Sequence, residues 1–146
     1  MNQDDPNLPF ELVSECVLLG RRWRAKVDER LKPTGMTLAR FTVLYWVNEL
    51  PEGTSQRALA EVMGIEDPTL VRLVHALEAQ GLIERAASAS DRRAKHLRLT
   101  PAARPLLEEL SHVTDAVSWE YLSRLEHRRL PSAIRLVREA RAALES

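Results

Sequence analysis

Apolar residues recur every three or four positions from Leu8 to Leu31, a spacing that places them along one side of an α-helix. Pro33 and Gly35 then interrupt the pattern. Thr37 follows as a suitable N-cap for a second helix, because a threonine hydroxyl can accept a hydrogen bond from a backbone amide of the first turn. The N-terminal part of the chain is therefore predicted to form two helices.

Two shorter helices are predicted after the loop "LPEGTS". Thr54 or Ser55 caps the first of them, and Gly64 ends it. The second covers about residues 67–80, with Asp67 as its N-cap, a proline in its first helical position and a glycine after its end. A connection of about three residues between two such helices is typical of a helix-turn-helix.

The helix over residues 67–80 has two different faces. Leu70, Val74 and Leu77 form an apolar face that indicates contact with a core. At about 100° per residue, four other residues share the opposite face. They are Pro68, Arg72, His75 and Ala79.

A β-hairpin is predicted next. Residues 82–86 and 95–99 have the composition of two short strands, and the loop "ASASDRR" lies between them. Side chains of a strand alternate between its two faces. In the second strand the two faces carry Leu97 with Leu99 and His96 with Arg98.

The remaining chain predicts two more helices. Thr100 is expected to cap a long one, with Pro101 in its first position. Its apolar positions are Ala103, Leu106, Leu110, Val113, Val117 and Tyr121. A last helix begins near Pro131 and carries an apolar set consisting of Ile134, Val137 and Leu144.

This order of elements predicts a mainly α fold with a small β-hairpin. A helix-turn-helix followed by a hairpin is a winged helix, which here covers residues 37–100. The helices of residues 1–36 and 101–146 flank it. We expect the flanking helices to mediate dimerisation, because their apolar stripes exceed what a small helix-turn-helix core can cover.

Charge is concentrated on the predicted wing, residues 86–95, and its flanks. The chain has 21 basic and 21 acidic residues, so its net charge is zero. Between Arg85 and Arg98, however, five basic residues stand against Asp91 alone, a local charge of +4 that leaves −4 for the rest. A basic patch on an otherwise acidic body is typical of a nucleic-acid interface.

Composition excludes several other classes. The single cysteine, Cys16, permits neither an internal disulfide nor a cysteine zinc cluster. The four histidines lack the spacing of metal ligands, and no apolar run is long enough to span a membrane. With an acidic N-terminus unlike a signal peptide, we expect a soluble cytoplasmic protein without metal or cofactor.

Enzymatic activity is not expected either. The chain has no glycine-rich phosphate loop, no nucleophile elbow and no paired His/Glu motif. A winged helix can also serve only as a protein-interaction module without specific DNA binding. That alternative shares the fold, but it does not require Arg72 and a basic wing together.

Two stretches resemble the MarR family of transcription regulators. "DRRAKHLRLT" is similar to the wing signature of that family, and "GIEDPTLVRLVHALEAQGLIER" to its recognition helix and first wing strand. With "ASDRRAK" the likeness is greatest to the SlyA branch, and it is strongest over residues 55–100. The family includes both repressors and activators, and the sequence does not distinguish them.

The resemblance implies a homodimer that binds palindromic double-stranded DNA, with a long interface built from both chain ends. It implies that Pro68 and Arg72 face the major groove and that Arg93 enters the minor groove. Some regulators of this family sense oxidants through an N-terminal cysteine. Cys16, however, lies on the apolar stripe, where a thiol usually acts as a small hydrophobic residue.

Further DNA contacts are open to two interpretations. Thr69 and Arg57 are candidate phosphate ligands, although surface position explains them equally well. Arg92 either pairs with Asp91 or binds a phosphate. His75 projects beside Arg72, where it either contacts a base or acts only as a spacer.

A ligand site is a further candidate. Arg21 and Arg24 share a helix face beside Trp23, and this helix is expected to pass near Phe41 and Tyr45. Two guanidinium groups and aromatic rings suit an aromatic carboxylate. The alternative is that the rings belong to the core and the arginines to the solvated surface.

Overall fold

The structure, a computed structural model, describes residues 6–87 and 95–144. Within these residues the chain forms helices and one antiparallel hairpin, so the predicted mainly α winged-helix fold is confirmed. In chain order the elements are α1 (Leu8–Leu31), a 3-10 turn (Lys32–Thr34), α2 (Leu38–Glu49), α3 (Gln56–Met63), α4 (Asp67–Ala79), β1 (Ile83–Ala87), β2 (Lys95–Leu99), α5 (Ala103–Leu122), a second 3-10 turn (His127–Arg129) and α6 (Leu130–Leu144).

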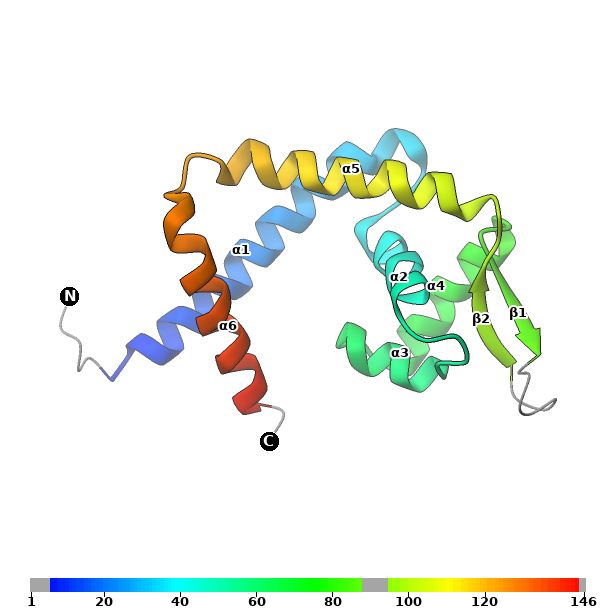
Figure 1. The fold of residues 1–146 in the computed structure, drawn as a ribbon, viewed down its shortest axis with the longest axis horizontal. Coiled ribbons are helices and arrows are strands. Elements are labelled where there is room, and N and C mark those ends of the chain that lie inside the picture. Colours follow the sequence, from blue (N-terminus) through cyan, green and yellow to red (C-terminus); the bar gives the residue numbers. More distant parts are fainter. Residues whose placement is uncertain (1–5, 88–94, 145–146) are drawn as a thin grey trace.

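The elements form two parts joined by α5 (Figure 1). One part, the winged-helix lobe, consists of α2, α3, α4 and the hairpin. From this lobe α5 runs to the opposite end of the molecule, where α6 turns away from it and where both termini lie. The wing and the chain ends are therefore at opposite ends of the structure.

The core of the winged-helix lobe lies where α2 packs against the helix-turn-helix and the hairpin. Its fully buried large side chains include Leu44 of α2 and the predicted α4 set of Leu70, Val74 and Leu77. Leu59 of α3 is buried in the same cluster. The apolar face predicted for the 67–80 helix is thus confirmed, and it fixes the outward direction of the opposite face.

Several helix ends follow from the local sequence as predicted. The hydroxyl of Thr37 accepts a hydrogen bond from the Arg40 amide, and that of Ser55 accepts one from the Ala58 amide. Gly64 ends α3 with a φ of 63°, a left-handed conformation that glycine adopts without strain. This turn directs the chain from α3 into α4.

One predicted helix start is wrong by a single residue. The N-cap of α4 is Glu66, whose backbone is extended and whose carbonyl oxygen accepts hydrogen bonds from the amides of Thr69 and Leu70. Asp67 is therefore the first helical residue and not the cap. There its carboxylate still lies in the first turn, where the helix dipole favours negative charge.

The start of α5 was also predicted too early. The helix begins at Ala103, and the Thr100 hydroxyl instead donates a hydrogen bond of 2.7 Å to the carbonyl oxygen of Gly81. A helix starting at Pro101 would place Pro105 beyond the first turn, where its missing N–H removes a helical hydrogen bond. Starting at Ala103 keeps Pro105 within the turn whose amides need no partner in the helix.

The hairpin has a simple antiparallel register in which Ile83 pairs with Leu99 and Glu84 with Arg98. His96 and Arg98 differ in exposure, although they alternate with Leu97 on β2. His96 is buried, with its Nε2 atom 3.3 Å from the carboxylate of Glu52. The turn between α2 and α3 therefore covers one end of the strand, while Arg98 stays exposed.

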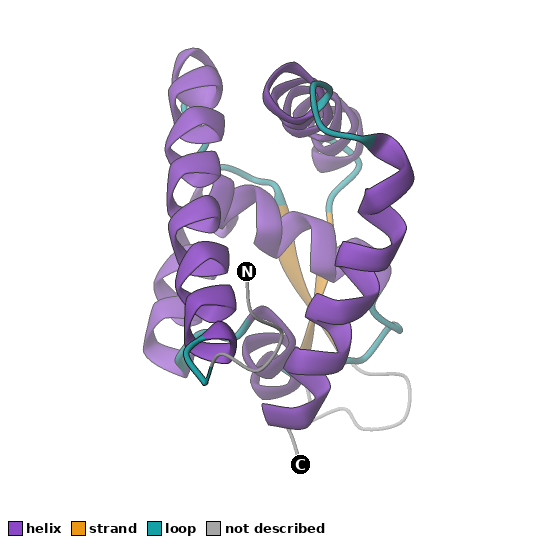
Figure 2. Ribbon diagram, turned by 90° about the vertical axis from the view of Figure 1, so that its left-hand side faces the viewer, coloured by secondary structure: helices purple, strands orange, loops and turns teal. Residues whose placement is uncertain are grey.

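The chain ends are only partly packed. Val27 and Leu31 near the end of α1 are buried, and the Trp23 indole donates a hydrogen bond of 3.0 Å to the Ser118 hydroxyl of α5. By contrast, no residue of α6 is buried. Figure 2 shows α6 standing apart from α1.

Candidate nucleic-acid interface

The outward face of α4 is the first component of the interface. Pro68, Arg72 and His75 are all exposed on it, and Thr69 is partly buried at its edge. The Arg72 guanidinium lies 3.4 Å from the Thr69 hydroxyl, at the long end of the hydrogen-bond range. Because the opposite face is anchored in the core, these side chains project from a rigid helix.

Arg57 belongs to α3, the helix before the turn. Its side chain is 82% exposed and forms an i,i+4 ion pair of 3.2 Å with Glu61 on the same helix. Such exposed pairs are weak, at about 0.3–0.5 kcal/mol, so the arginine can exchange this partner for another anion.

The basic cluster around the wing is smaller than the sequence indicates. Arg85 forms an ion pair of 2.8 Å with Glu78 of α4, and Arg98 one of 2.6 Å with Glu84 on the neighbouring strand. Two of the five basic residues counted between positions 85 and 98 are therefore neutralised. The predicted contacts Arg92 and Arg93 lie outside the described residues.

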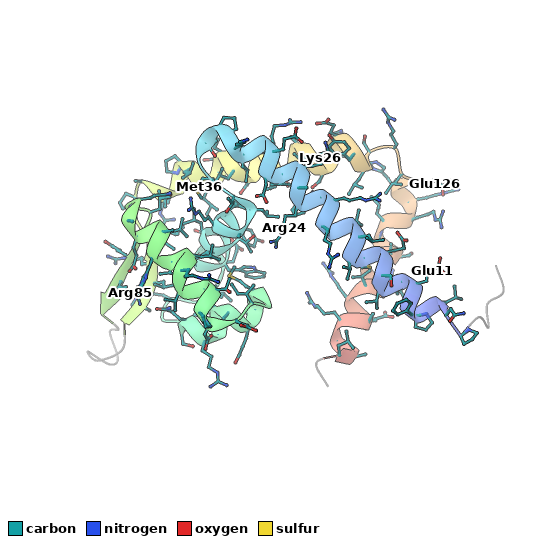
Figure 3. All side chains as sticks on the ribbon, turned by 180° about the vertical axis from the view of Figure 1, so that it is seen from behind. Glu11, Arg24, Lys26, Met36, Arg85 and Glu126 are labelled. Carbon is teal, nitrogen blue, oxygen red and sulfur yellow. The ribbon has the colours of Figure 1, made fainter. Side chains whose placement is uncertain are left out.

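Arg85 has a structural role that sequence reasoning missed. Besides its ion pair with Glu78 it donates a hydrogen bond to the Gln56 side chain, at the first residue of α3. Its guanidinium thus joins the wing to both helices of the helix-turn-helix, and Figure 3 shows it at the hairpin. Partners seven and 29 positions away give no local sequence signal.

Replacing Arg85 with alanine should disturb this junction. We expect a loss of about 1 kcal/mol in the free energy of unfolding, since charge-assisted bonds of a partly exposed group are removed. Operator affinity should fall because the wing loses its position, but the dependence of affinity on salt should not change. Urea unfolding and DNA titrations at several salt concentrations measure both.

Arg98→Ala is the matched control, because it removes the exposed cross-strand ion pair with Glu84. It should have a smaller effect than Arg85→Ala on the free energy of unfolding and on operator affinity. If Arg85→Ala instead made the salt dependence shallower by about one phosphate contact, Arg85 would be a DNA ligand and not a positioning residue.

Comparison with known proteins agrees with this geometry. The sequence profile of the MarR family matches residues 34–94, which include the helix-turn-helix and the first wing strand. The solved structure of the transcriptional regulator PA3341 is 36% identical, with a TM-score of 0.82, and the match covers 90% of this chain and 96% of that one. The chain belongs to the MarR family. It is a winged-helix, DNA-binding transcription regulator.

Two other MarR-type structures illustrate the range of similarity. CouR from Rhodococcus jostii RHA1, bound to p-coumaroyl-CoA, is 29% identical with a TM-score of 0.72, over 97% of this chain and 91% of CouR. MepR from S. aureus, in complex with DNA, shares the fold at 20% identity, with a TM-score of 0.78 over 90% of this chain and 96% of MepR.

The predicted ligand residues of this MarR-family chain are not gathered around one of the described cavities. Arg21 and Arg24 are exposed on α1, and Figure 3 shows Arg24 on that helix. Trp23 lines a groove of about 380 Å³ between α1 and α5, whereas Tyr45 lines one of about 360 Å³ between α2 and α5. Phe41 is buried, with its ring centroid 6.2 Å from that of Tyr45.

Two general features concern other classes of site. Within residues 6–87 and 95–144, histidine, cysteine and acidic side chains form no cluster of three or more that could hold a metal ion. None of the helices described is both long and apolar enough to cross a membrane. Cys16 is partly buried on α1.

Proposed function

We propose that this MarR-family regulator binds a palindromic operator as a homodimer, with one α4 in the major groove of each half-site. The observation that best supports this proposal is that α4 has one fully buried face, while its opposite face is exposed and presents Arg72. An arginine at such a position can donate two hydrogen bonds to a guanine edge. Pro68 and His75 flank it on the helix, while Thr69 and Arg57 are placed to reach phosphates.

The wing, residues 86–95, is proposed to enter the adjacent minor groove. Arg92 and Arg93 carry this part of the proposal, which rests on the sequence "SDRRAK" and its likeness to the SlyA branch of the family. Arginine suits a narrow minor groove because the negative potential is strongest there.

The homodimer is supported by apolar side chains that the single chain leaves uncovered. They lie on the N-terminal half of α1, on the last turn of α5 and its following loop, and on α6. They are Phe10, Val13, Val17, Trp119, Tyr121, Leu125, Ile134, Leu136, Val137 and Leu144. We therefore assign residues 1–36 and 101–146 to dimerisation and residues 37–100 to DNA binding.

Selection from a pool of random double-stranded DNA tests this function. We expect enrichment of a two-fold symmetric site whose half-sites lie about 10 base pairs apart, because two recognition helices then meet successive major grooves. The alternative function is a winged-helix protein-interaction module without specific DNA binding. Retention of the pool without sequence enrichment, lost at moderate salt, would favour that alternative over specific regulation.

A small aromatic carboxylate is proposed as an effector that lowers operator affinity. Arg21 and Arg24 would bind its carboxylate, and Trp23, Phe41 and Tyr45 would contact its ring. The p-aminosalicylic acid bound by the Mycobacterium tuberculosis MarR-family protein Rv2887, which is 26% identical over 88% of this chain, is an aromatic carboxylate and supports this chemistry. Such a ligand acts only if it binds better to a conformation that does not fit the operator.

Salicylate at millimolar concentration should therefore weaken operator binding when ionic strength is matched. Arg21→Ala and Arg24→Ala should each reduce this effect while leaving the affinity without ligand unchanged. Matched ionic strength is essential, because added salt alone weakens DNA binding. An identical dissociation constant with and without salicylate would contradict the effector proposal, but not the DNA-binding one.

A further inference from the structure

The exposed face of α4 carries an apolar side chain beside the predicted DNA contacts. Val71 is 37% exposed, whereas Val74 on the same helix is fully buried. Val71 lies one turn after Pro68 and one turn before His75, and both of these residues are exposed as well. It therefore belongs to the outward surface that presents Arg72, although it cannot form hydrogen bonds there.

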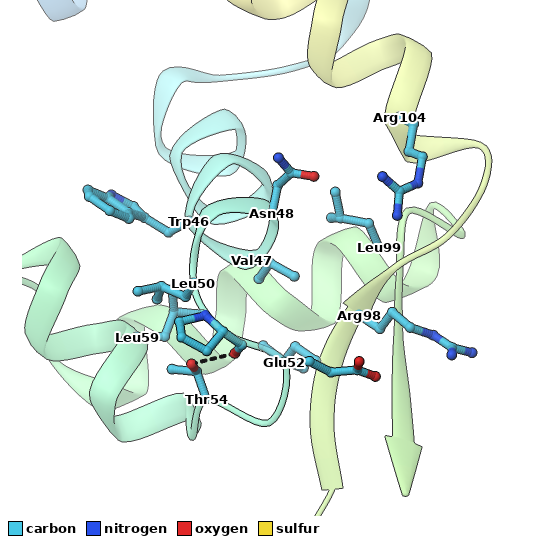
Figure 4. Close-up of a pocket in the computed structure, with 12 residues that line it drawn as sticks. Trp46, Val47, Asn48, Leu50, Glu52, Thr54, Leu59, Arg98, Leu99 and Arg104 are labelled. Atoms are coloured by element: carbon cyan, nitrogen blue, oxygen red, sulfur yellow. Dashed lines mark hydrogen bonds between the residues drawn. The ribbon is translucent and has the colours of Figure 1, made fainter. Parts of the chain in front are cut away.

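Packing within the single chain does not explain this valine. A β-branched residue on a helix surface favours the helix less than alanine does. Val71 lines neither the cavity of about 370 Å³ behind the wing, which Figure 4 shows between the end of α2, β2 and the start of α5, nor the two grooves along α5. It also lies far from the uncovered apolar residues at the chain ends that support the homodimer (Figure 1).

The position of Arg72 leaves Val71 open. The Arg72 guanidinium lies 3.4 Å from the Thr69 hydroxyl. At about 100° per residue, Thr69 and Val71 are on opposite flanks of Arg72. The outward surface is thus divided into a part with hydrogen-bond donors, on the Thr69 side, and an apolar part formed by Val71 and Pro68.

The stiffness of valine suits it to a contact of fixed geometry. Its branched side chain has one strongly preferred χ1 rotamer in a helix, so the positions of its two methyl groups follow from the position of the helix. Val71 lies in the second turn of α4, and the N-terminal residues of a recognition helix are those that contact base edges. In the major groove the apolar group of the bases is the C5-methyl of thymine.

We propose that Val71 contacts the C5-methyl group of a thymine in each operator half-site and thereby selects a T·A pair near the base pair that Arg72 contacts. This inference rests on the proposed function, in which α4 enters the major groove. A cytosine in the same place would present no methyl group. Its N4 amino group would face a side chain that cannot accept a hydrogen bond, which adds to the discrimination.

A thymine-to-deoxyuridine scan of the selected operator tests the contact. Deoxyuridine lacks only the C5-methyl group and keeps the base pair. Each thymine is replaced in turn, at the equivalent position of both half-sites, and the affinity of the full-length protein is measured. At one position we expect a loss of about fourfold for each half-site, or about tenfold or more for both, as when one methyl group loses an apolar contact.

Val71→Ala shows whether Val71 is the partner of that methyl group. The variant should bind the unmodified operator about tenfold more weakly than the wild type does, and it should bind the deoxyuridine operator with the same affinity to within about twofold. Such non-additivity is expected for two groups in direct contact. Because alanine favours a helix, the circular dichroism and the urea midpoint should be retained.

Val62→Ala is the matched control, since Val62 is a valine of α3 that is 46% exposed and lies outside the recognition helix. It should show the same loss on deoxyuridine DNA as the wild type. If Val71→Ala kept that loss, or if no thymine were sensitive in the wild type, the inference would be overturned. A selection without a symmetric site would contradict the proposed function itself, whereas an enriched site without a thymine coupled to Val71 would contradict only this contact.

Discussion

The double substitution Ile134→Glu/Val137→Glu is expected to convert the dimer to a monomer and to lower operator affinity by about 100-fold or more. The affinity loss follows from avidity, since two linked modules bind about 10²–10⁴ times more tightly than one. Ile134 and Val137 are 49% and 43% exposed in the single chain and share one face of α6. In the proposed dimer this face is buried, and an unpaired carboxylate buried there is strongly unfavourable.

Arg135→Glu is a suitable control for this pair. It lies on the other side of α6 and changes the net charge by −2, as the double substitution does. We expect Arg135→Glu to remain dimeric and to bind operator nearly as the wild type does. Light scattering and operator titration measure the two properties, and a double variant that stays dimeric at micromolar concentration would place the interface elsewhere.

The double substitution on α6 should leave the rest of the protein folded. The buried core joins the winged-helix lobe, with residues such as Leu44 and Leu77, to parts of α1 and α5, whereas α6 contributes no buried residue to the single chain. The double variant should therefore keep its helical circular dichroism. Loss of DNA binding would then report loss of the second half-site and not unfolding.

Much of the fold follows from local sequence. The buried set of Leu70, Val74 and Leu77 was predicted from periodicity alone, because a helix repeats every 3.6 residues whatever it packs against. Caps at Thr37 and Ser55 were likewise predictable, since each depends on a hydroxyl and an amide three residues later.

Features that depend on distant residues were not predictable in this way. Arg85 belongs to the predicted basic wing, but its guanidinium binds Gln56 and Glu78 at the junction with the helix-turn-helix. His96 alternates with leucines as an exposed strand residue would, yet the turn containing Glu52 covers it. The pair of Glu84 and Arg98 is an exception, because the register of a hairpin places the two residues opposite each other.

Arg72→Ala should have the other large effect. We expect a loss of about 1–3 kcal/mol in the free energy of binding to the selected operator, because a bidentate contact with a base edge is removed. Affinity for random DNA should change much less, so discrimination between the two should shrink. Arg72→Lys should restore the positive charge but not the discrimination between operator and random DNA, because an ammonium group lacks the planar pair of hydrogen-bond donors.

Arg93→Ala separates wing contacts from helix contacts. As a minor-groove and phosphate contact, Arg93 should contribute similarly on operator and random DNA, so its loss should weaken both. The slope of log affinity against log salt should become shallower by about one unit per protomer, whereas the change for Arg72→Ala should lie mainly in the sequence preference. Titration of both DNAs at four salt concentrations measures the two signatures. If Arg93→Ala left affinity and slope unchanged, the wing would not be a DNA contact, and recognition would depend on α4 alone.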